Sequence, residues 1–187
     1  MKATLEGATF NRLIGAVRNF TGKNDARPQN RLIQLHFHKD GTLVEAYALD
    51  GYRAAKECAI CYTVDEDFSV LVNAPPLKAN GSIAVEVEAA DGFAYISYGD
   101  IRFRTKQPDA EMFDVQKVIK DAMQKPDIMR FGANVDYLLD ALKSLKASGA
   151  SSRKPIIVEF RSPVEPIILR TDQDNPKVVL PIRIKTE

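Results

Sequence analysis

The 187-residue sequence contains no tryptophan, only two cysteines and only two histidines. Two cysteines are too few for a disulfide framework in a chain of this length. No apolar run approaches the roughly 18–20 residues that span a bilayer, and residues 1–7 lack the apolar core of a signal peptide. These absences predict a soluble intracellular protein, located in the cytoplasm, with no membrane partner.

Neither sign of charge is in excess, because 26 basic residues are balanced by 25 acidic ones and the formal net charge is +1. The chain as a whole therefore supplies no strong field toward a polyanion. Any contact with nucleic acid would have to come from a local patch of basic side chains.

Recognisable catalytic motifs are also missing. The sequence has no phosphate-cradling glycine loop, no Gly-x-Ser-x-Gly elbow and no His-Glu-x-x-His helix. Cys58 and Cys61 have the spacing of a redox or zinc pair, and His36 and His38 fall on one face of a predicted strand. Without a second cysteine pair or an evident carboxylate partner, the sequence predicts no enzyme, no metal and no cofactor. A metal-dependent or thiol enzyme using these four residues is a minor hypothesis.

What the sequence does contain is a repeat. Gly7-Ala8-Thr9 and Gly132-Ala133-Asn134 each precede apolar residues at helical spacing. Each copy is followed by a strand-like run that starts on a basic residue, at 31–37 and at 154–160. The repeat predicts one supersecondary unit, a helix feeding a set of strands, at both ends of the chain.

Residue patterns place the elements. Apolar positions predict a helix from Phe10 to Phe20, capped by Thr9, and a second helix at 135–146. Alternation predicts antiparallel strands across 31–105, with others at 128–131, 156–160, 167–170 and 178–184, and a short helix is indicated within 107–127. The prediction is an α+β fold with antiparallel sheets and two long amphipathic helices related by pseudo-symmetry. It has units at 1–107 and 128–187, with 108–127 as the connecting segment.

Two segments resemble the bacterial DNA sliding clamp, the beta subunit of DNA polymerase III. Val178-Val179-Leu180-Pro181-Ile182-Arg183-Ile184 is similar to its closing strand, and Ala48-Leu49-Asp50-Gly51-Tyr52-Arg53 to its Ala-Thr-Asp-Gly-x-Arg segment. The resemblance implies a DNA-clamp-like fold. A clamp subunit has three similar domains, and this chain is about half as long. The helix expected after 68–72 is predicted to be missing, replaced by residues 75–81, so 1–107 resembles a clamp unit with its second helix reduced and 128–187 a half-unit.

The resemblance implies contacts to the backbone of duplex DNA, without sequence specificity, from the polar faces of helices that line a ring. The candidate DNA-binding residues are Arg12, Arg18, Lys23, Lys143, Lys146, Arg153 and Lys154. An ordinary solvated helix face explains the same residues about as well.

The resemblance also implies a cleft for short peptide motifs of polymerases and repair proteins. The candidate peptide-binding residues are Leu49, Gly51, Tyr52, Arg53, Val178, Leu180, Pro181, Ile182 and Arg183. Leu49 stands where clamps usually have Thr, and Tyr52 where His is frequent. In the alternative interpretation, Val178, Leu180 and Ile182 face a core.

The leading hypothesis is a sliding-clamp-like processivity factor that tethers a polymerase or another DNA-processing protein to duplex DNA. It requires a homo-oligomeric ring, and three chains would supply the six domains of a clamp ring if each contributed two. The alternative is a monomeric clamp-fold adaptor or decoy that binds peptide motifs or clamp proteins without encircling DNA.

Overall fold

The computed structural model describes residues 1–22, 28–73, 81–109, 112–127, 129–172 and 174–184. Its contacts divide the chain into two compact units, Met1–Lys125 and Pro126–Glu187. Within the described ranges, no helix has the length and apolar character needed to cross a membrane.

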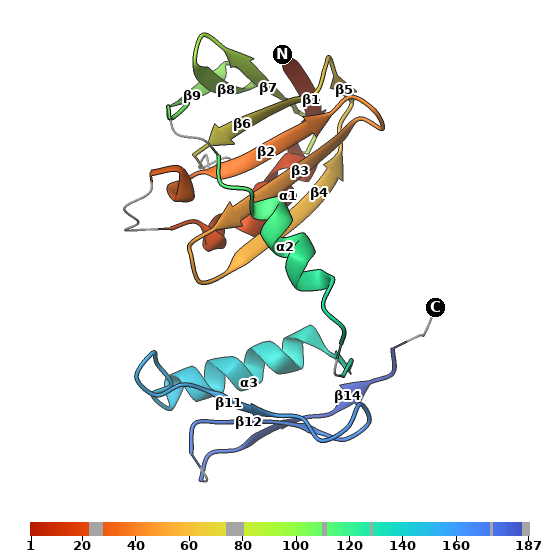
Figure 1. The fold of residues 1–187 in the computed structure, drawn as a ribbon, viewed down its shortest axis with the longest axis vertical. Helices are drawn as coiled ribbons and strands as arrows, with labels where there is room; N and C mark the ends of the chain where they lie inside the picture. The colour runs from red at the N-terminus through yellow and green to blue at the C-terminus, as the bar shows by residue number, and fades with distance from the viewer. Residues whose placement is uncertain (23–27, 74–80, 110–111, 128, 173, 185–187) are drawn as a thin grey trace. The chain divides into compact units, whose positions relative to one another are not determined.

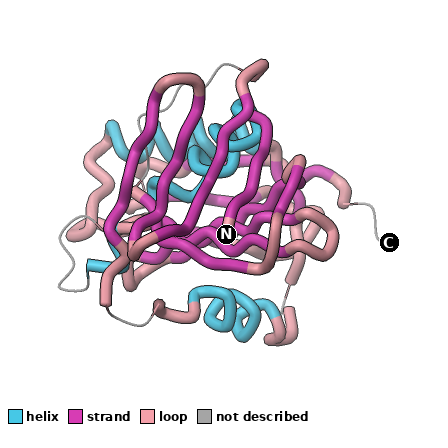
Figure 2. The backbone as a smooth tube through the Cα atoms, turned by 90° about the horizontal axis from the view of Figure 1, so that it is seen from above, coloured by secondary structure: helices cyan, strands magenta, loops and turns pink. Residues whose placement is uncertain are grey.

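The first unit is built on two antiparallel sheets, which we name by one strand of each (Figures 1 and 2). The β1 sheet has the strand order β5-β1-β7-β8-β9, and the β2 sheet has the order β4-β3-β2-β6. Their bounds are β1 (Lys2–Glu6), β2 (Ile33–His38), β3 (Leu43–Leu49), β4 (Ala54–Ile60), β5 (Thr63–Val64), β6 (Phe68–Val72), β7 (Ala84–Ala90), β8 (Phe93–Tyr98) and β9 (Ile101–Lys106).

The core of this unit lies between the sheets and helix α1 (Gly7–Val17), as the alternation in the sequence predicts. Every second residue of β2 faces it, and Ile33, Leu35 and Phe37 are almost completely buried. α1 contributes its apolar stripe, and a 3₁₀ turn at Arg18–Phe20 prolongs it. A second 3₁₀ turn, Pro28–Arg31, precedes β2. The predicted helix is therefore present, with an irregular last turn.

The start of α1 differs from the prediction that Thr9 caps it. The cap position is Glu6, and Thr9 lies inside the helix, where its hydroxyl donates a 2.8 Å hydrogen bond to the Glu6 carboxylate. The reason is that β1 runs directly into the helix, so that Gly7 is already helical. The helix begins earlier than its first apolar residue.

A second helix, α2 (Val115–Met123), lies on the opposite face of the β2 sheet. Tyr47 and Leu71 point to this face and are fully buried, as is Val115. Just before α2, the Gln34 side-chain amide donates a 2.9 Å hydrogen bond to the Phe113 carbonyl. Much of the segment predicted to connect two domains is thus packed on the first unit.

The described residues of the second unit form one helix and five short strands. Their bounds are β10 (Gly132–Ala133), α3 (Val135–Ala147), β11 (Ile157–Glu159), β12 (Ile167–Arg170), β13 (Lys177–Val179) and β14 (Pro181–Ile182). Asn134 caps α3, since its side chain accepts hydrogen bonds from the backbone of Asp136 and Tyr137. The core is small, with five buried apolar residues: Ala141, Leu145, Ile167, Leu169 and Val179.

The predicted repeat is present in the topology. In the first unit, β1 leads into α1, β2 to β4 form a meander, and β5 returns to pair with β1. In the second unit, β10 leads into α3, β11 to β13 form a meander, and β14 returns to pair with β10. The alignment of the helices was wrong by three residues, because Gly7 opens α1 whereas α3 opens at Val135 and not at Gly132.

The last part of the chain differs from the prediction in two places. The strand predicted at 128–131 lies instead at β10, where Gly132 approaches β14 so closely that a Cβ would meet the Ile182 carbonyl oxygen at 2.7 Å. The single strand predicted at 178–184 is divided by Leu180 into β13 and β14. The segment predicted to replace a clamp helix is 75–81, of which 75–80 lie outside the described residues.

Candidate functional site

The turn between β3 and β4 is held by Asp50. Its carboxylate accepts backbone hydrogen bonds from Tyr52 and Arg53, both at 3.1 Å, and a 2.8 Å bond from the Arg53 guanidinium. The Arg53 hydrogen bond is the main cause that lowers the pKa of Asp50. Gly51 supplies the positive φ of 88° that the turn requires. Tyr52 is left 99% exposed on a fixed backbone.

An open pocket of about 380 Å³ lies between this turn and α2. The strand and turn contribute one wall, and four residues of α2 contribute the other. The lining consists of Leu49, Gly51, Tyr52, Arg53 and Ala54 together with Val118, Ile119, Ala122 and Met123. All four predicted peptide-binding residues of the first unit therefore line one pocket, with an apolar helix face that sequence reasoning did not include.

The second unit has a pocket of its own, of about 560 Å³, between α3 and β13. It is lined by Tyr137, Asp140, Ala141 and Ser144 of the helix and by residues 176–180. Val178 and Leu180 are exposed here and Val179 is buried, so the interpretation that Val178, Leu180 and Ile182 face a core is wrong for this unit. Pro181 and Ile182 pair with β10, and Arg183 is exposed beyond them.

No protein-family model and no curated protein sequence matches the chain. Solved structures do. The DNA polymerase sliding clamp of Bacillus subtilis superposes on all of the chain with a TM-score of 0.80 at 13% identity. The DNA polymerase III beta chain of Streptococcus pneumoniae also covers all of it, with a TM-score of 0.77 at 14% identity. This chain has the DNA sliding-clamp fold.

A third structure with this fold is the Helicobacter pylori beta clamp bound to a DNA ligase peptide, which covers 90% of the chain with a TM-score of 0.60 at 16% identity. The chain spans about half the length of these clamps: 50% of the B. subtilis protein, 51% of the S. pneumoniae protein and 48% of the H. pylori protein. The fold predicted from the sequence is confirmed.

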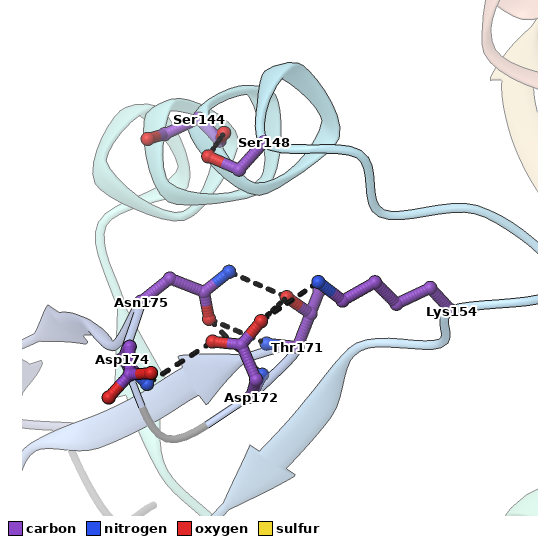
Figure 3. Close-up of polar contacts among 7 residues, drawn as sticks. All are labelled: Ser144, Ser148, Lys154, Thr171, Asp172, Asp174 and Asn175. Carbon is purple, nitrogen blue, oxygen red and sulfur yellow. Dashed lines mark hydrogen bonds and ion pairs between the residues drawn. The ribbon is translucent and has the colours of Figure 1, made fainter.

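Several predicted DNA-binding residues of this clamp fold are engaged by acidic partners. Arg12 pairs with Glu57 at 3.0 Å, and Lys154 pairs with Asp172 at 2.8 Å in the β12–β13 turn (Figure 3). Lys143 lies 3.8 Å from the Asp140 carboxylate. The exposed candidates Arg18, Lys146 and Arg153 complete the described set, and Lys23 lies outside the described residues.

The residues of the enzyme hypothesis do not converge. Cys58 is exposed on the outer face of β4, whereas Cys61 is buried in the core. His36 contacts Ser69 at 3.0 Å and His38 contacts Glu45 at 3.3 Å. Among the described residues, no group of three or more histidine, cysteine or acidic side chains could hold a metal ion.

A polar cluster that sequence reasoning missed lies beside His38 on the outer face of the β2 sheet. The buried Tyr47 hydroxyl donates a 2.9 Å hydrogen bond to Glu45, and Lys56 pairs with the same carboxylate at 2.5 Å. Burial opposes ionisation of Glu45, but the hydrogen bonds from Lys56 and Tyr47 outweigh it and lower its pKa. The partners satisfy one another, which is typical of a structural cluster.

The two thiols are expected to differ in reactivity. Burial raises the pKa of Cys61 to about 11, and its side chain is covered, so that little thiolate is available to a reagent. Iodoacetamide should therefore modify one cysteine, Cys58, in the native protein and both after unfolding, as counted by intact mass. Equal rates of modification for both cysteines in the native protein would contradict this packing.

Proposed function

We propose that the chain acts as a sliding-clamp-like processivity factor in the cytoplasm, tethering a polymerase or another DNA-processing protein to duplex DNA. The observation that carries the proposal is the superposition of the whole chain on sliding clamps. It performs no chemistry of its own. A tethered enzyme rebinds its template instead of diffusing away, because its effective concentration near the DNA stays high.

The two pockets support peptide binding. Each combines exposed apolar side chains with a few polar groups, Arg53 in one and Asp140 and Ser144 in the other. This composition suits a short apolar peptide anchored by hydrogen bonds. The H. pylori beta clamp was crystallised with a DNA ligase peptide, and we infer a client of the same kind here.

The chain presents little positive charge to DNA, so a ring closed around the DNA would retain it better than contacts to the phosphates would. Arg12 and Lys154 are already paired with carboxylates, and the net charge of the chain is +1. Few phosphate contacts give modest affinity that falls with salt. A closed ring would stay on circular DNA without strong contacts, and it would slide off the end of a linear molecule.

The experiment that tests the proposal compares circular and linear duplex DNA. The protein is incubated with a relaxed circular plasmid, half of the sample is cut once with a restriction enzyme, and both halves are passed over a sizing column at moderate salt. Encirclement predicts that protein elutes with the circles and is lost from the linear molecules. Equal recovery on both forms, or none on either, would overturn it.

A second candidate is the monomeric adaptor that binds peptide motifs without encircling DNA. It is equally compatible with the pairing of Arg12 and Lys154 with acidic groups, since an adaptor of this kind needs no contact with phosphates. It predicts binding of the labelled DNA ligase peptide by a protein that never stays on circular DNA. Retention on circles alone would exclude this candidate.

A further inference from the structure

The second unit repeats only half of the domain formed by the first. In the first unit, the edge of β2 that faces away from β3 pairs with β6, and the edge of β1 that faces away from β5 pairs with β7. The equivalent strands of the second unit are β11 and β10. Within the described part of the chain, β11 pairs only with β12, and β10 only with β14.

The apolar residues of β2 and their counterparts around β11 differ in burial in the same way. Ile33, Leu35 and Phe37 of β2 are at most 1% exposed, because β6 and the β1 sheet cover them. The repeat aligns them with Ile156, Val158 and Phe160, where Ile156 is half-buried and the other two are 44% and 43% exposed. Of the twenty large apolar side chains that are exposed among the described residues, twelve fall in the second unit, which holds about a third of the chain. A surface that covered Val158 and Phe160 would therefore have to be apolar.

In the first unit, the covering half is itself a copy of the half that it covers. β7, β8 and β9 form a meander like that of β2, β3 and β4. The two contacts between the halves have matching registers, since Leu35 pairs with Val70 and Val87 pairs with Ala3. Two halves of one kind thus complete each other through two equivalent antiparallel strand pairs.

We propose that the second unit is completed by the second unit of another copy of this chain. β11 of each copy would pair with β10 of the other, reproducing both strand pairs of the first unit around a two-fold axis. Such an interface is closed, because each copy offers the same two edges and receives the same two. It would remove two free strand edges from solvent and cover Val158 and Phe160. It does not depend on DNA or peptide binding.

The strand pairs of the first unit give the register that is expected for this interface. Arg130 precedes the α3 cap Asn134 by as many residues as Lys2 precedes the α1 cap Glu6. Val87 of β7 is the counterpart of Leu35 of β2, which the repeat aligns with Val158, so Glu88 corresponds to Glu159. Lys2 pairs with Glu88 across β1 and β7. Arg130 is therefore placed opposite Glu159 of the second copy.

The chemistry of the edges agrees with that register. Arg130 and Glu159 are opposite charges, which stabilise a cross-strand pair. On the inner face, Phe131 is placed opposite Val158 of the second copy, beside the Phe160 ring that it already contacts at 4.6 Å between centroids. Charged side chains would then rim an apolar centre.

The test is a disulfide across the expected pair. In the 187-residue chain carrying Cys58→Ser, which removes the exposed native thiol, Arg130→Cys and Glu159→Cys are introduced together and each alone. Paired residues on antiparallel strands lie about 4.5–5.5 Å apart between Cα atoms, within the range of a disulfide. Mild oxidation should give about tenfold more covalent dimer from the double variant than from either single variant, on a non-reducing gel.

The Arg130 side chain is 79% exposed and that of Glu159 is 30% exposed, and folding of the variants is verified by circular dichroism before oxidation. Equal cross-linking of the double and single variants overturns the proposal. As a second measurement, Val158→Asp should lower the dimer fraction seen by light scattering, while Val164→Asp, at an exposed position outside both strands, should not. A Val158→Asp variant that stays folded and fully associated would also overturn it. Failure on circular DNA with successful cross-linking would reject only the clamp function.

Discussion

Replacing Leu145 with alanine is expected to unfold the second unit while the first unit stays folded. Leu145 is fully buried and is one of five described residues that are buried in that core. Such a truncation costs about 2–5 kcal/mol, which is comparable to the whole stability of a unit of this size. Hydrogen exchange followed by mass spectrometry should show protection lost across 126–187 and retained across 1–125, since the two units have separate cores.

Leu142→Ala is the matched control, because it makes the same change one turn away on the same helix at a residue that is 40% exposed. It should leave protection in the second unit largely intact. Loss of protection in both units with Leu145→Ala, or equal effects of the two substitutions, would contradict the division into separate cores.

Replacing Ala122 with glutamate is expected to weaken peptide binding at least about tenfold, or by about 1.4 kcal/mol. Ala122 lines the pocket beside the Asp50–Arg53 turn, and a carboxylate there would have to lose water when an apolar peptide enters. Fluorescence anisotropy with the labelled DNA ligase peptide would measure the dissociation constant. The prediction rests on the proposed peptide site.

Gln116→Glu is the control, since it adds the same charge to the exposed surface of α2 away from the pocket lining. It should bind the peptide like the unmodified protein. If both variants bind equally well, the pocket between the turn and α2 is not where the peptide binds.

The sequence predicted the repeated helix-and-strand unit because its apolar periodicity reflects burial directly. It placed the register of the repeat wrongly, since a shift of three residues is nearly one helical turn and superposes apolar positions on apolar positions. The Gly-Ala pairs that guided the alignment have different roles: Gly7 opens a helix, while Gly132 lies in a strand against Ile182. A close backbone approach of that kind leaves no periodic signal.

The candidate site was predicted in part. The Asp50-Gly51-Tyr52-Arg53 turn could be found because its residues resemble a family motif, and its internal hydrogen bonds are local. The wall that α2 supplies depends on how residues distant in sequence pack, which periodicity does not reveal. The pairing of Lys154 with Asp172 (Figure 3) likewise depends on the pairing of β11 with β12, which brings the residues before β11 beside the turn after β12.

If the second units of two chains pair as proposed, the shared domain sets the number of chains in the proposed ring. Two chains joined through their second units would contain three domains: one complete domain from each chain and one shared between them. That equals the length of one clamp subunit, since each chain spans about half of a clamp. Four chains, not three, would then supply the six domains of the ring that the resemblance implies.

The most direct test is the molar mass of the full chain in solution, measured by light scattering over a range of concentrations. One chain has a mass of 20.8 kDa. We expect two chains at about 42 kDa, rising to four at about 83 kDa as concentration increases. A mass that stays at one chain throughout would contradict both the shared domain and the closed ring, and a stable trimer would contradict the shared domain.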